Sequence, residues 1–332
     1  MTNIAEIAKR AGVGTTTVSR YLNNRPYVSA EKKQRIEQAI KALDYTPSAI
    51  ATQLRVQATK NIGVLVSRIT NPFFTALFDA LERSLHEYGY QVMVMQTYDD
   101  AQAEARFLDK LKSQQLDGVI LASVEDVSAI RRIAEDYPGR IVLLNEAVRI
   151  PGVQSIILDH RQATLTGLNY LAQQGHPPIA YVTGGSFYKS SHGADRNEAY
   201  RAYLKQRRLP LNKKWIFEHQ HTVLDGQQLA QALIAQPKAV WPDAYFTNSD
   251  EVALGMIAEL LKHHIKVPKD IAIMGYDDQP LAAYLPVPLT TIRQPIKVMA
   301  EVAVVDLLQG LKQKVHPVAV EPQLKLIVRQ SA

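Results

Sequence analysis

Short apolar runs alternate with amphipathic stretches from residue 61 onward. The run 62–66 is typical of a buried strand, and 72–88 of a helix whose apolar side chains recur every three or four positions. A first series of strands is expected at 62–66, 91–95, 118–122, 141–145 and 155–159, and a second at 179–183, 215–218, 244–248 and 271–275, with helices at 72–88, 101–115, 127–136, 161–174, 194–206, 225–236 and 250–263. This strand–helix repeat predicts an α/β protein with two doubly wound parallel-sheet subdomains.

The first 46 residues carry a different pattern of three short helices without strands. Asn3 can cap the first helix, and Gly12–Gly14 end it. A second helix is expected from Thr15 to Leu22, and a third from Ser29, with Ile36, Ala39, Ile40 and Leu43 on its apolar face. Two short helices joined by a glycine-containing turn, with a third that supports them, predict an all-α helix-turn-helix head.

The positive charge of the chain is concentrated in this head. The formal net charge is +6, and residues 1–60 hold ten Lys and Arg but only four Asp and Glu. The other 272 residues hold 28 of each sign and are neutral. A basic head on a neutral body is typical of a polyanion binder, most often of nucleic acid, and the alternative is a solvated basic surface.

The expected second helix carries side chains that suit a DNA groove. The major groove presents acceptors, donors and thymine methyl groups, which small polar and cationic side chains can contact. Thr15, Thr16, Ser19 and Arg20 are of this kind, and Asn23, Ser29 and Lys32 are candidates for phosphate contacts. The alternative is a three-helix cap or dimerisation bundle in which the threonines only cap a helix.

Several function classes are disfavoured by what the sequence lacks. Without cysteine there is no disulfide and no thiolate site, which fits a cytoplasmic protein. No run of about 18 apolar residues predicts a membrane span, and Glu6, Lys9 and Arg10 stand where a signal peptide would be apolar. We found no catalytic, metal-binding or dinucleotide motif, so we expect no enzyme activity, no metal and no cofactor.

Polar and aromatic residues follow the expected strands of the body. In an open α/β sheet, ligands bind at the carboxyl ends of the strands. Arg196 and Asp277 can bind hydroxyl pairs, and Phe73 or Phe74 can cover the C–H face of a sugar. Each has a structural alternative: Asp277 as a turn residue, Arg196 as part of a surface ion pair, and Phe73 as a helix staple.

The head resembles that of the lactose/purine repressor family of bacterial transcription regulators. The resemblance rests on the strings IAEIAKRAGVGTTTVSRYLN, VSAEKKQRI and LDYTPSAIATQL. It implies that Thr15, Thr16 and Arg20 read the major groove and that Ser19, Asn23, Ser29 and Tyr45 contact phosphate or pack, while Thr17 belongs to the matching Thr-Val-Ser-Arg motif. It also implies a hinge helix whose Leu54 enters the minor groove, although Ser48 and Thr52 depart from the family's usual Asn and Arg.

The body resembles the effector core of the same family, which is similar to periplasmic sugar-binding proteins. The resemblance implies Phe73 and Phe74 at the cleft and Arg196 and Asp277 as ligand contacts. Ser249 stands where some members carry a ligand-contacting Asn, and His221 stands near a stacking aromatic of others. Residues 290–295 are implied as a crossover, the chain recrosses near 320, and 323–332 supply the last strand. A C-terminal tetramerising repeat is absent, so a homodimer is expected.

The resemblance also implies a domain organisation. The head would occupy 1–46, the hinge 47–59, and the effector core 60–332, with an N-terminal subdomain at about 60–160 and 292–320 and a C-terminal one at about 161–291 and 321–332. The expected function is repression of sugar-utilisation genes, with operator DNA and a small sugar-like effector as partners and no membrane. A corepressor-type regulator, in which a ligand or partner protein strengthens DNA binding, and a sugar-binding or sugar-active module remain alternatives.

Overall fold

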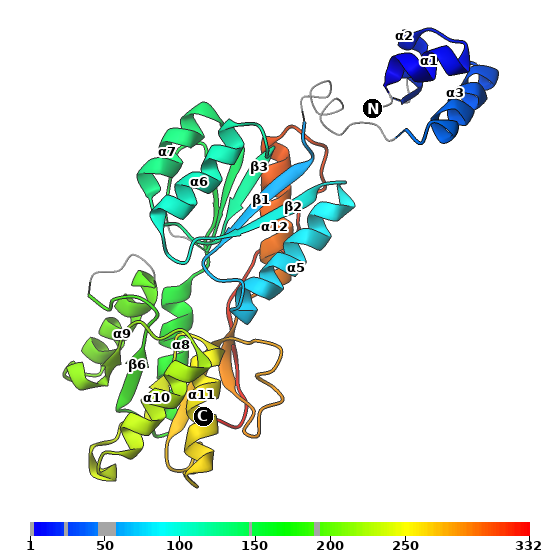
Figure 1. Ribbon diagram of the computed structural model, residues 1–332. Helices are drawn as coiled ribbons and strands as arrows, with labels where there is room; N and C mark the ends of the chain where they lie inside the picture. The colour runs from blue at the N-terminus through cyan, green and yellow to red at the C-terminus, as the bar shows by residue number, and fades with distance from the viewer. Residues whose placement is uncertain (1–2, 23–25, 46–57, 146–147, 189–192) are drawn as a thin grey trace. The chain divides into compact units, whose positions relative to one another are not determined.

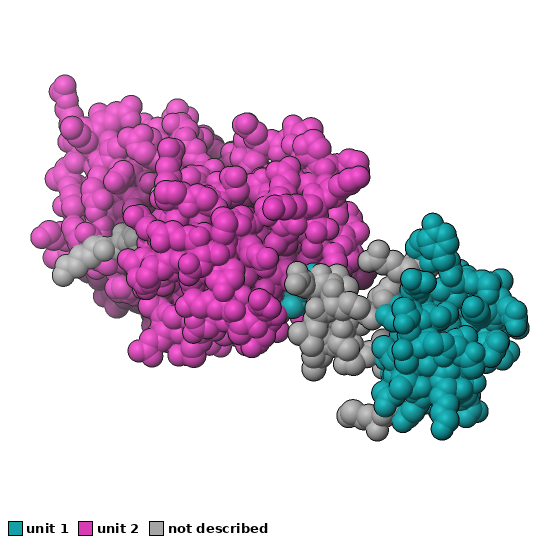
Figure 2. Space-filling model, turned by 90° about the horizontal axis from the view of Figure 1, so that it is seen from above, with its two compact units in different colours: residues 1–59 teal, residues 60–332 magenta. Residues whose placement is uncertain are grey.

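The chain separates into two compact units, residues 1–59 and 60–332, which Figure 2 colours separately. The computed structural model describes residues 3–22, 26–45, 58–145, 148–188 and 193–332. Asn23, Ser48, Thr52, Leu54 and most of the predicted hinge therefore lie outside the described residues. Each unit is considered by itself.

The first unit contains the three expected helices, α1 (Ile4–Ala11), α2 (Thr15–Leu22) and α3 (Ala30–Ala42). Asn3 caps α1 by accepting a hydrogen bond from the backbone N–H of Glu6 at 3.0 Å. Gly12 ends α1 in the left-handed region (φ 61°), and its carbonyl accepts a hydrogen bond from Arg35 at 3.2 Å. The left-handed backbone angle favours glycine at position 12.

The second unit begins with a five-stranded parallel sheet in the order β2-β1-β3-β4-β5. Its strands are β1 (Asn61–Val66), β2 (Gln91–Gln96), β3 (Gly118–Leu121), β4 (Ile141–Leu144) and β5 (Gln154–Ile156). The helices α5 (Pro72–Glu87) and α12 (Ile296–Gly310) pack on one face, and α6 (Ala101–Lys112) and α7 (Val127–Asp136) on the other (Figure 1). We call this sheet with its four helices the first lobe.

A six-stranded sheet in the order β11-β10-β9-β8-β6-β7 forms the second lobe. Its strands are β6 (Ile179–Val182), β7 (Ile216–Phe217), β8 (Ala244–Phe246), β9 (Ala272–Asp277), β10 (Thr290–Arg293) and β11 (Lys325–Ile327). The helices α8 (His160–Gln173) and α9 (Ala194–Gln206) cover one face, and α10 (Val223–Ile234) and α11 (Asp250–Lys262) cover the other. Two short 3-10 helices, η1 (Lys213–Trp215) and η2 (Lys238–Val240), complete it.

The second sheet departs from the expected parallel arrangement at one edge. β11 pairs antiparallel with β10, with Lys325 opposite Arg293. The reason lies in the path of the chain, because α12 begins next to β10 and leads away from the lobe boundary. The returning segment enters the second lobe at the carboxyl end of β10, so the last strand runs in the opposite direction.

Three local expectations are also corrected. Residues 290–293 form β10 of the second sheet and the chain crosses to the first lobe after Arg293, so Ile292 and Arg293 pair with β9 and β11 instead of belonging to the N-terminal subdomain. The strand expected at 155–159 ends at Ile156, because Asp159 caps α8 by accepting from the N–H of Gln162. Only Ile216 and Phe217 of 215–218 form a strand, since Trp215 ends η1.

Within the described ranges, no helix combines the length and the apolar run that a membrane span requires.

Candidate functional site

A cavity of about 500 Å³ lies between the two lobes of the second unit. Its walls are built from residues at or just after the carboxyl ends of strands in both sheets, where open α/β sheets bind ligands. The first lobe contributes Ser67, Asn71, Phe73, Phe74, Asp99, Ala122, Ser123 and Asn145; the second contributes Thr183–Ser186, Gly193–Arg196, His219, His221, Asn248, Ser249 and Asp277; the joining segments contribute His160 and Gln294.

All six residues predicted to contact a ligand line this single cavity. They are Phe73, Phe74, Arg196, His221, Ser249 and Asp277. They come from five separate parts of the sequence, and only the two-lobed fold brings them together. Their roles as ligand contacts remain predictions.

The aromatic wall is set by the start of α5. Asn71 caps this helix by accepting from the N–H of Phe73 at 2.8 Å, and Pro72 occupies the first turn. Phe73 and Phe74 then meet edge to face with ring centroids 5.2 Å apart. Phe73 is also part of the apolar core, so it both packs the first lobe and lines the cavity.

Arg196 occupies the opposite wall, in the first turn of α9. It donates a hydrogen bond to the backbone carbonyl of Asn248 at 3.1 Å, and its guanidinium lies 4.8 Å from the ring centroid of Tyr276. The surface-ion-pair alternative does not describe this residue, whose guanidinium is held against a carbonyl and an aromatic ring at the cavity.

Asp277 ends β9 with an unusual backbone angle, φ 111°. Its Oδ1 accepts a hydrogen bond from Gln294 at 2.6 Å. Burial raises the pKa of Asp277 to about 7, against the hydrogen bond from Gln294 and the positive charge of Arg196. A buried carboxyl in a strained conformation at a cavity wall is typical of a functional position.

Ser249 and His221 are placed by the helices that they precede. Ser249 caps α11 by accepting from the N–H of Val252 at 3.4 Å, so its hydroxyl already has a structural partner. The backbone N–H of His221 donates to Asp225 at 2.8 Å at the start of α10. Burial, followed by the charge of Arg68, lowers the pKa of His221, while Asp99 and Asp225 act in the opposite direction.

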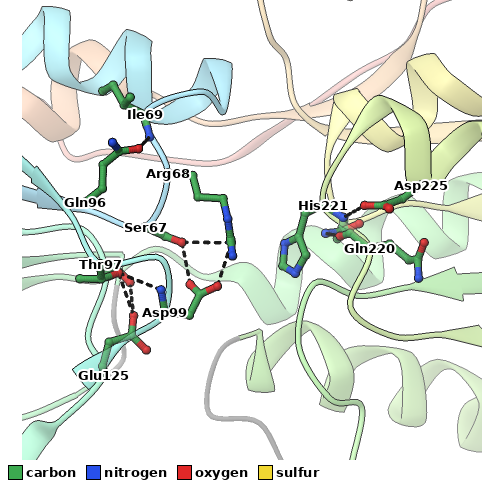
Figure 3. Close-up of polar contacts among 12 residues, drawn as sticks. Ser67, Arg68, Ile69, Gln96, Thr97, Asp99, Glu125, Gln220, His221 and Asp225 are labelled. Atoms are coloured by element: carbon green, nitrogen blue, oxygen red, sulfur yellow. Dashed lines mark hydrogen bonds and ion pairs between the residues drawn. The ribbon is translucent and has the colours of Figure 1, made fainter. Parts of the chain in front are cut away.

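A charged pair of the first lobe faces His221 across the cavity mouth (Figure 3). Asp99 accepts hydrogen bonds from Ser67 at 2.6 Å and from Arg68 at 2.8 Å. Burial alone would raise the pKa of Asp99, but these two hydrogen bonds and the charge of Arg68 lower it on balance. The mouth therefore carries a fixed carboxylate on one lobe and an imidazole on the other.

Asn145, Gln294 and His160 are among the cavity residues that the sequence did not single out. Asn145 follows β4 and Gln294 follows β10, so the strand-end signal that singled out Asp277 could have found them. His160 begins α8, and burial together with the charge of Arg196 lowers its pKa to about 3. No sequence pattern marked His160, because its surroundings come from distant segments.

No metal site accompanies this arrangement in the described ranges, since no three His, Cys, Asp or Glu side chains are grouped to hold an ion there. The cavity instead combines hydroxyl, amide, carboxyl and guanidinium groups with two phenylalanine rings. Such a lining suits an uncharged polyhydroxylated molecule.

In the first unit, the predicted DNA readers lie on α2. Thr15, Thr16 and Arg20 are exposed, and Thr17 and Ser19 are half-buried. Val18 faces the opposite way and is fully buried with Ile7 and Ile36, which fixes the orientation of α2. Because Val18 anchors α2 in the core of the head, the polar side chains of α2 on the other side are exposed to solvent.

The remaining predicted DNA contacts have mixed placements. Ser29 caps α3 and is exposed, with its hydroxyl accepting from the N–H of Lys32 at 3.4 Å. Tyr45 is half-buried and packs against the apolar core of the head. Asn23 and Leu54 lie outside the described residues, so their predicted contacts stay predictions.

Both units match models of known protein families. Residues 3–48 match the bacterial regulatory proteins of the lacI family, and residues 59–299 match the periplasmic binding proteins and sugar binding domain of the LacI family. The chain is 33% identical over 316 residues to the ribose operon repressor of Escherichia coli, with 94% of each chain covered.

Solved structures agree with this match. The second unit is similar to a LacI family transcriptional regulator from Lactobacillus casei with bound glucose, at 50% identity and a TM-score of 0.79, covering 82% of this chain and 99% of that one. The whole chain is similar to the Lac repressor dimer bound to operator and the anti-inducer ONPF, at 25% identity and a TM-score of 0.83, covering 99% and 98%.

Proposed function

Because this chain belongs to the LacI family of bacterial regulatory proteins, we propose that it is a sequence-specific DNA-binding repressor whose operator affinity is controlled by a small sugar. It acts as a homodimer, so that two heads occupy the half-sites of a pseudo-palindromic operator. Its place of action is the bacterial cytoplasm, where the operator DNA is. The similarity to an operator-bound Lac repressor dimer supports DNA binding as a homodimer.

The observation that carries this proposal is the convergence of six separately predicted residues on one cavity between two lobes. Arg196 and Asp277 offer a charged donor and an acceptor for hydroxyl groups, and Phe73 and Phe74 offer aromatic surface for the C–H face of a pyranose. A regulator that is 50% identical over the second unit has glucose bound. We therefore propose a neutral mono- or disaccharide as the effector.

DNA recognition is assigned to α2 and the residues around it. We propose that Thr15, Thr16 and Arg20 contact base edges, and that Thr17, Ser19, Asn23, Ser29 and Tyr45 contact phosphates or position the helix. The segment 47–59, with Leu54 as the minor-groove wedge, is proposed as the hinge that connects operator binding to the core.

Effector and operator are expected to oppose each other. A sugar that stabilises one arrangement of the lobes lowers operator affinity only by as much as it prefers that arrangement. Coupling of this kind amounts to about 1–3 kcal/mol, or roughly 5- to 150-fold in affinity, and it is reciprocal.

The test begins with selection of operator sequences from random double-stranded DNA by the full-length protein. Affinity for the selected duplex is then measured by fluorescence anisotropy at fixed salt, with and without glucose, sucrose or ribose. We expect tight binding to a pseudo-palindrome and a lower affinity in the presence of at least one sugar.

Other outcomes would support the alternatives. Stronger operator binding in the presence of a sugar would indicate a corepressor-type regulator. Sugar binding without any selected duplex, or conversion of the sugar, would indicate a sugar-binding or sugar-active module. No selected duplex and no bound sugar would contradict the proposal.

A further inference from the structure

Four hydrogen bonds connect Tyr276 to its neighbour Asp277 by a path that leaves the second lobe and returns. The Tyr276 hydroxyl lies 2.6 Å from Nδ1 of His160, and Nε2 of the same ring meets Oδ1 of Asn145. Nδ2 of Asn145 donates to Oε1 of Gln294 at 3.2 Å, and Nε2 of Gln294 donates to Oδ1 of Asp277 at 2.6 Å. We call these five residues the polar relay.

The direction of the polar relay is fixed by its amides. Each amide presents one oxygen and one nitrogen, so a donor at one end requires an acceptor at the other. Because Gln294 donates to Asp277 and accepts from Asn145, the oxygen of Asn145 faces His160. The ring must then carry its proton on Nε2 and accept from the Tyr276 hydroxyl at Nδ1. All four bonds therefore point from Tyr276 toward Asp277.

The surroundings of His160 agree with this direction. A doubly protonated ring has no acceptor nitrogen, so it could not receive the Tyr276 hydroxyl. Burial, followed by the charge of Arg196, lowers the pKa of His160 to about 3, which keeps the ring neutral in the working range of a cytoplasmic protein. Tyr276 is fully buried, so its hydroxyl would lose free energy of solvation without gaining a hydrogen bond if it had no partner.

Asn145 is the member of the polar relay that belongs to the first lobe. It follows β4 in the left-handed region (φ 63°), and its backbone N–H donates to the carbonyl of Ile156 at 2.9 Å. His160 and Gln294 come from the two segments that join the lobes, and Tyr276 and Asp277 end β9. Any movement of one lobe against the other therefore acts on the two side-chain bonds of Asn145.

We propose that Asn145 is a positioning residue: it sets the direction of the polar relay and thereby holds Gln294 as a donor to the cavity-facing carboxyl of Asp277. In its relevance to effector binding, this proposal rests on the proposed function. The direction of the bonds is a property of the free protein and can be tested without a ligand.

The isosteric substitution Asn145→Asp removes the hydrogen-bond donor that faces Gln294 and puts an acceptor in its place. It replaces the Nδ2 donor by an oxygen that faces Oε1 of Gln294, so the Gln294 amide must turn over. Gln294 then presents its oxygen to Asp277, which only a protonated carboxyl can meet. Asp also tolerates the left-handed backbone, so the substitution causes little backbone strain.

Other charged groups also interact with Asp277 and contribute to its pKa before any substitution is made. They are Arg196 from α9 and Asp250 and Glu251 from α11, and the side chain of Gln279 also lowers the pKa of Asp277. The substitution leaves these groups in place, but it adds a negative charge that itself favours protonation of Asp277. A double-mutant cycle with Gln294→Met separates the two effects, because without the Gln294 amide only the through-space charge remains.

The experiment measures thermal unfolding of the full-length protein against pH. Each background is compared with its own Asp277→Asn counterpart, and the difference gives the titration midpoint of Asp277 by linkage. We expect Asn145→Asp to raise this midpoint by about one pH unit or more in the wild-type background, and by less than half as much in the Gln294→Met background. Asn212→Asp, which adds a charge at the cap of η1, should leave the midpoint unchanged.

Equal shifts in both backgrounds, or no shift in the wild-type background, would overturn the proposal. If Asn145→Asp does not fold, Gln294→Met alone decides, because loss of the Gln294 donor must also raise the midpoint, and an unchanged midpoint rejects the relay. Glucose titrations of the wild-type protein are run in parallel. Absence of glucose binding there would count against glucose as the effector and would leave the midpoints unaffected.

Discussion

Arg196 donates a hydrogen bond from Nη1 to the backbone carbonyl of Asn248 at 3.1 Å, which fixes its guanidinium at the wall of the cavity. The bond joins two elements, since Arg196 lies in the first turn of α9 and Asn248 lies in the loop between β8 and α11. Within the described residues, Arg196 uses one of its five N–H donors in this bond, and the others can meet hydroxyl groups of a ligand.

Arg196→Ala should weaken glucose binding by about tenfold to 100-fold, because hydrogen bonds from a charged donor contribute about 1.5–3 kcal/mol each. Operator binding without sugar should not change, since Arg196 lies in the second unit. Isothermal titration with glucose and fluorescence anisotropy with operator check both statements. The matched control is Arg207→Ala, which removes the same charge next to Tyr203, outside the cavity. Glucose affinity unaltered by Arg196→Ala would remove this residue from the site.

Arg20→Ala should lower affinity for the selected operator by about 1–3 kcal/mol and relax the preference at one base position, as expected for loss of a base contact. Glucose affinity should stay unchanged. Anisotropy against operator variants at several salt concentrations measures both the affinity and the salt slope. Arg83→Ala is the control, because it removes an exposed charge from α5 in the neutral second unit. A uniform loss across all duplexes would instead assign Arg20 to phosphate.

Asp277→Asn should stabilise the protein increasingly as the pH rises from about 4 to 7, and by a constant amount above that. The pKa of Asp277 is raised to about 7, so between roughly pH 4 and 7 the folded protein binds a proton that the unfolded chain has released. Stability therefore falls through this range in the wild type, and Asn removes the effect. Three pKa units set an upper limit of about 4 kcal/mol.

Urea unfolding of both proteins at each pH measures this difference. Asp79→Asn is the control, because it removes an exposed carboxyl of α5 that is paired with Arg83. A difference between Asp277→Asn and wild type that stays constant with pH would show that Asp277 titrates normally.

Gly255→Ala should destabilise the second unit by about 2 kcal/mol, although alanine favours a helix interior by about 1 kcal/mol. A Cβ at Gly255 would lie 1.9 Å from the carbonyl oxygen of Val223, where α10 and α11 are in close contact. Thermal unfolding checks the sign. On the exposed face of the same helix, Ala258→Gly should also destabilise, there through helix propensity alone. A stabilised Gly255→Ala variant would mean that the two helices can separate without cost.

The sequence by itself determined the elements and their class. Apolar periodicity is a local property, so it located the strands of both sheets other than β10 and β11, and the three helices of the head, to within a few residues. It also placed Arg196, Asp277 and the two phenylalanines at strand ends, where the α/β architecture requires ligands to bind.

Only the tertiary structure decided how distant segments meet. The antiparallel direction of β11 depends on where α12 returns the chain, and the crossover after Arg293 depends on pairing with β9 and β11. The polar relay could not be predicted because it joins four segments. The sequence around a histidine or an asparagine does not indicate which distant side chain it will hydrogen-bond. The local sequence determines which residues form helices and strands and which of their faces are hydrophobic. The direction of buried hydrogen bonds and the pKa of buried groups depend on burial and on neighbours that only the fold brings together.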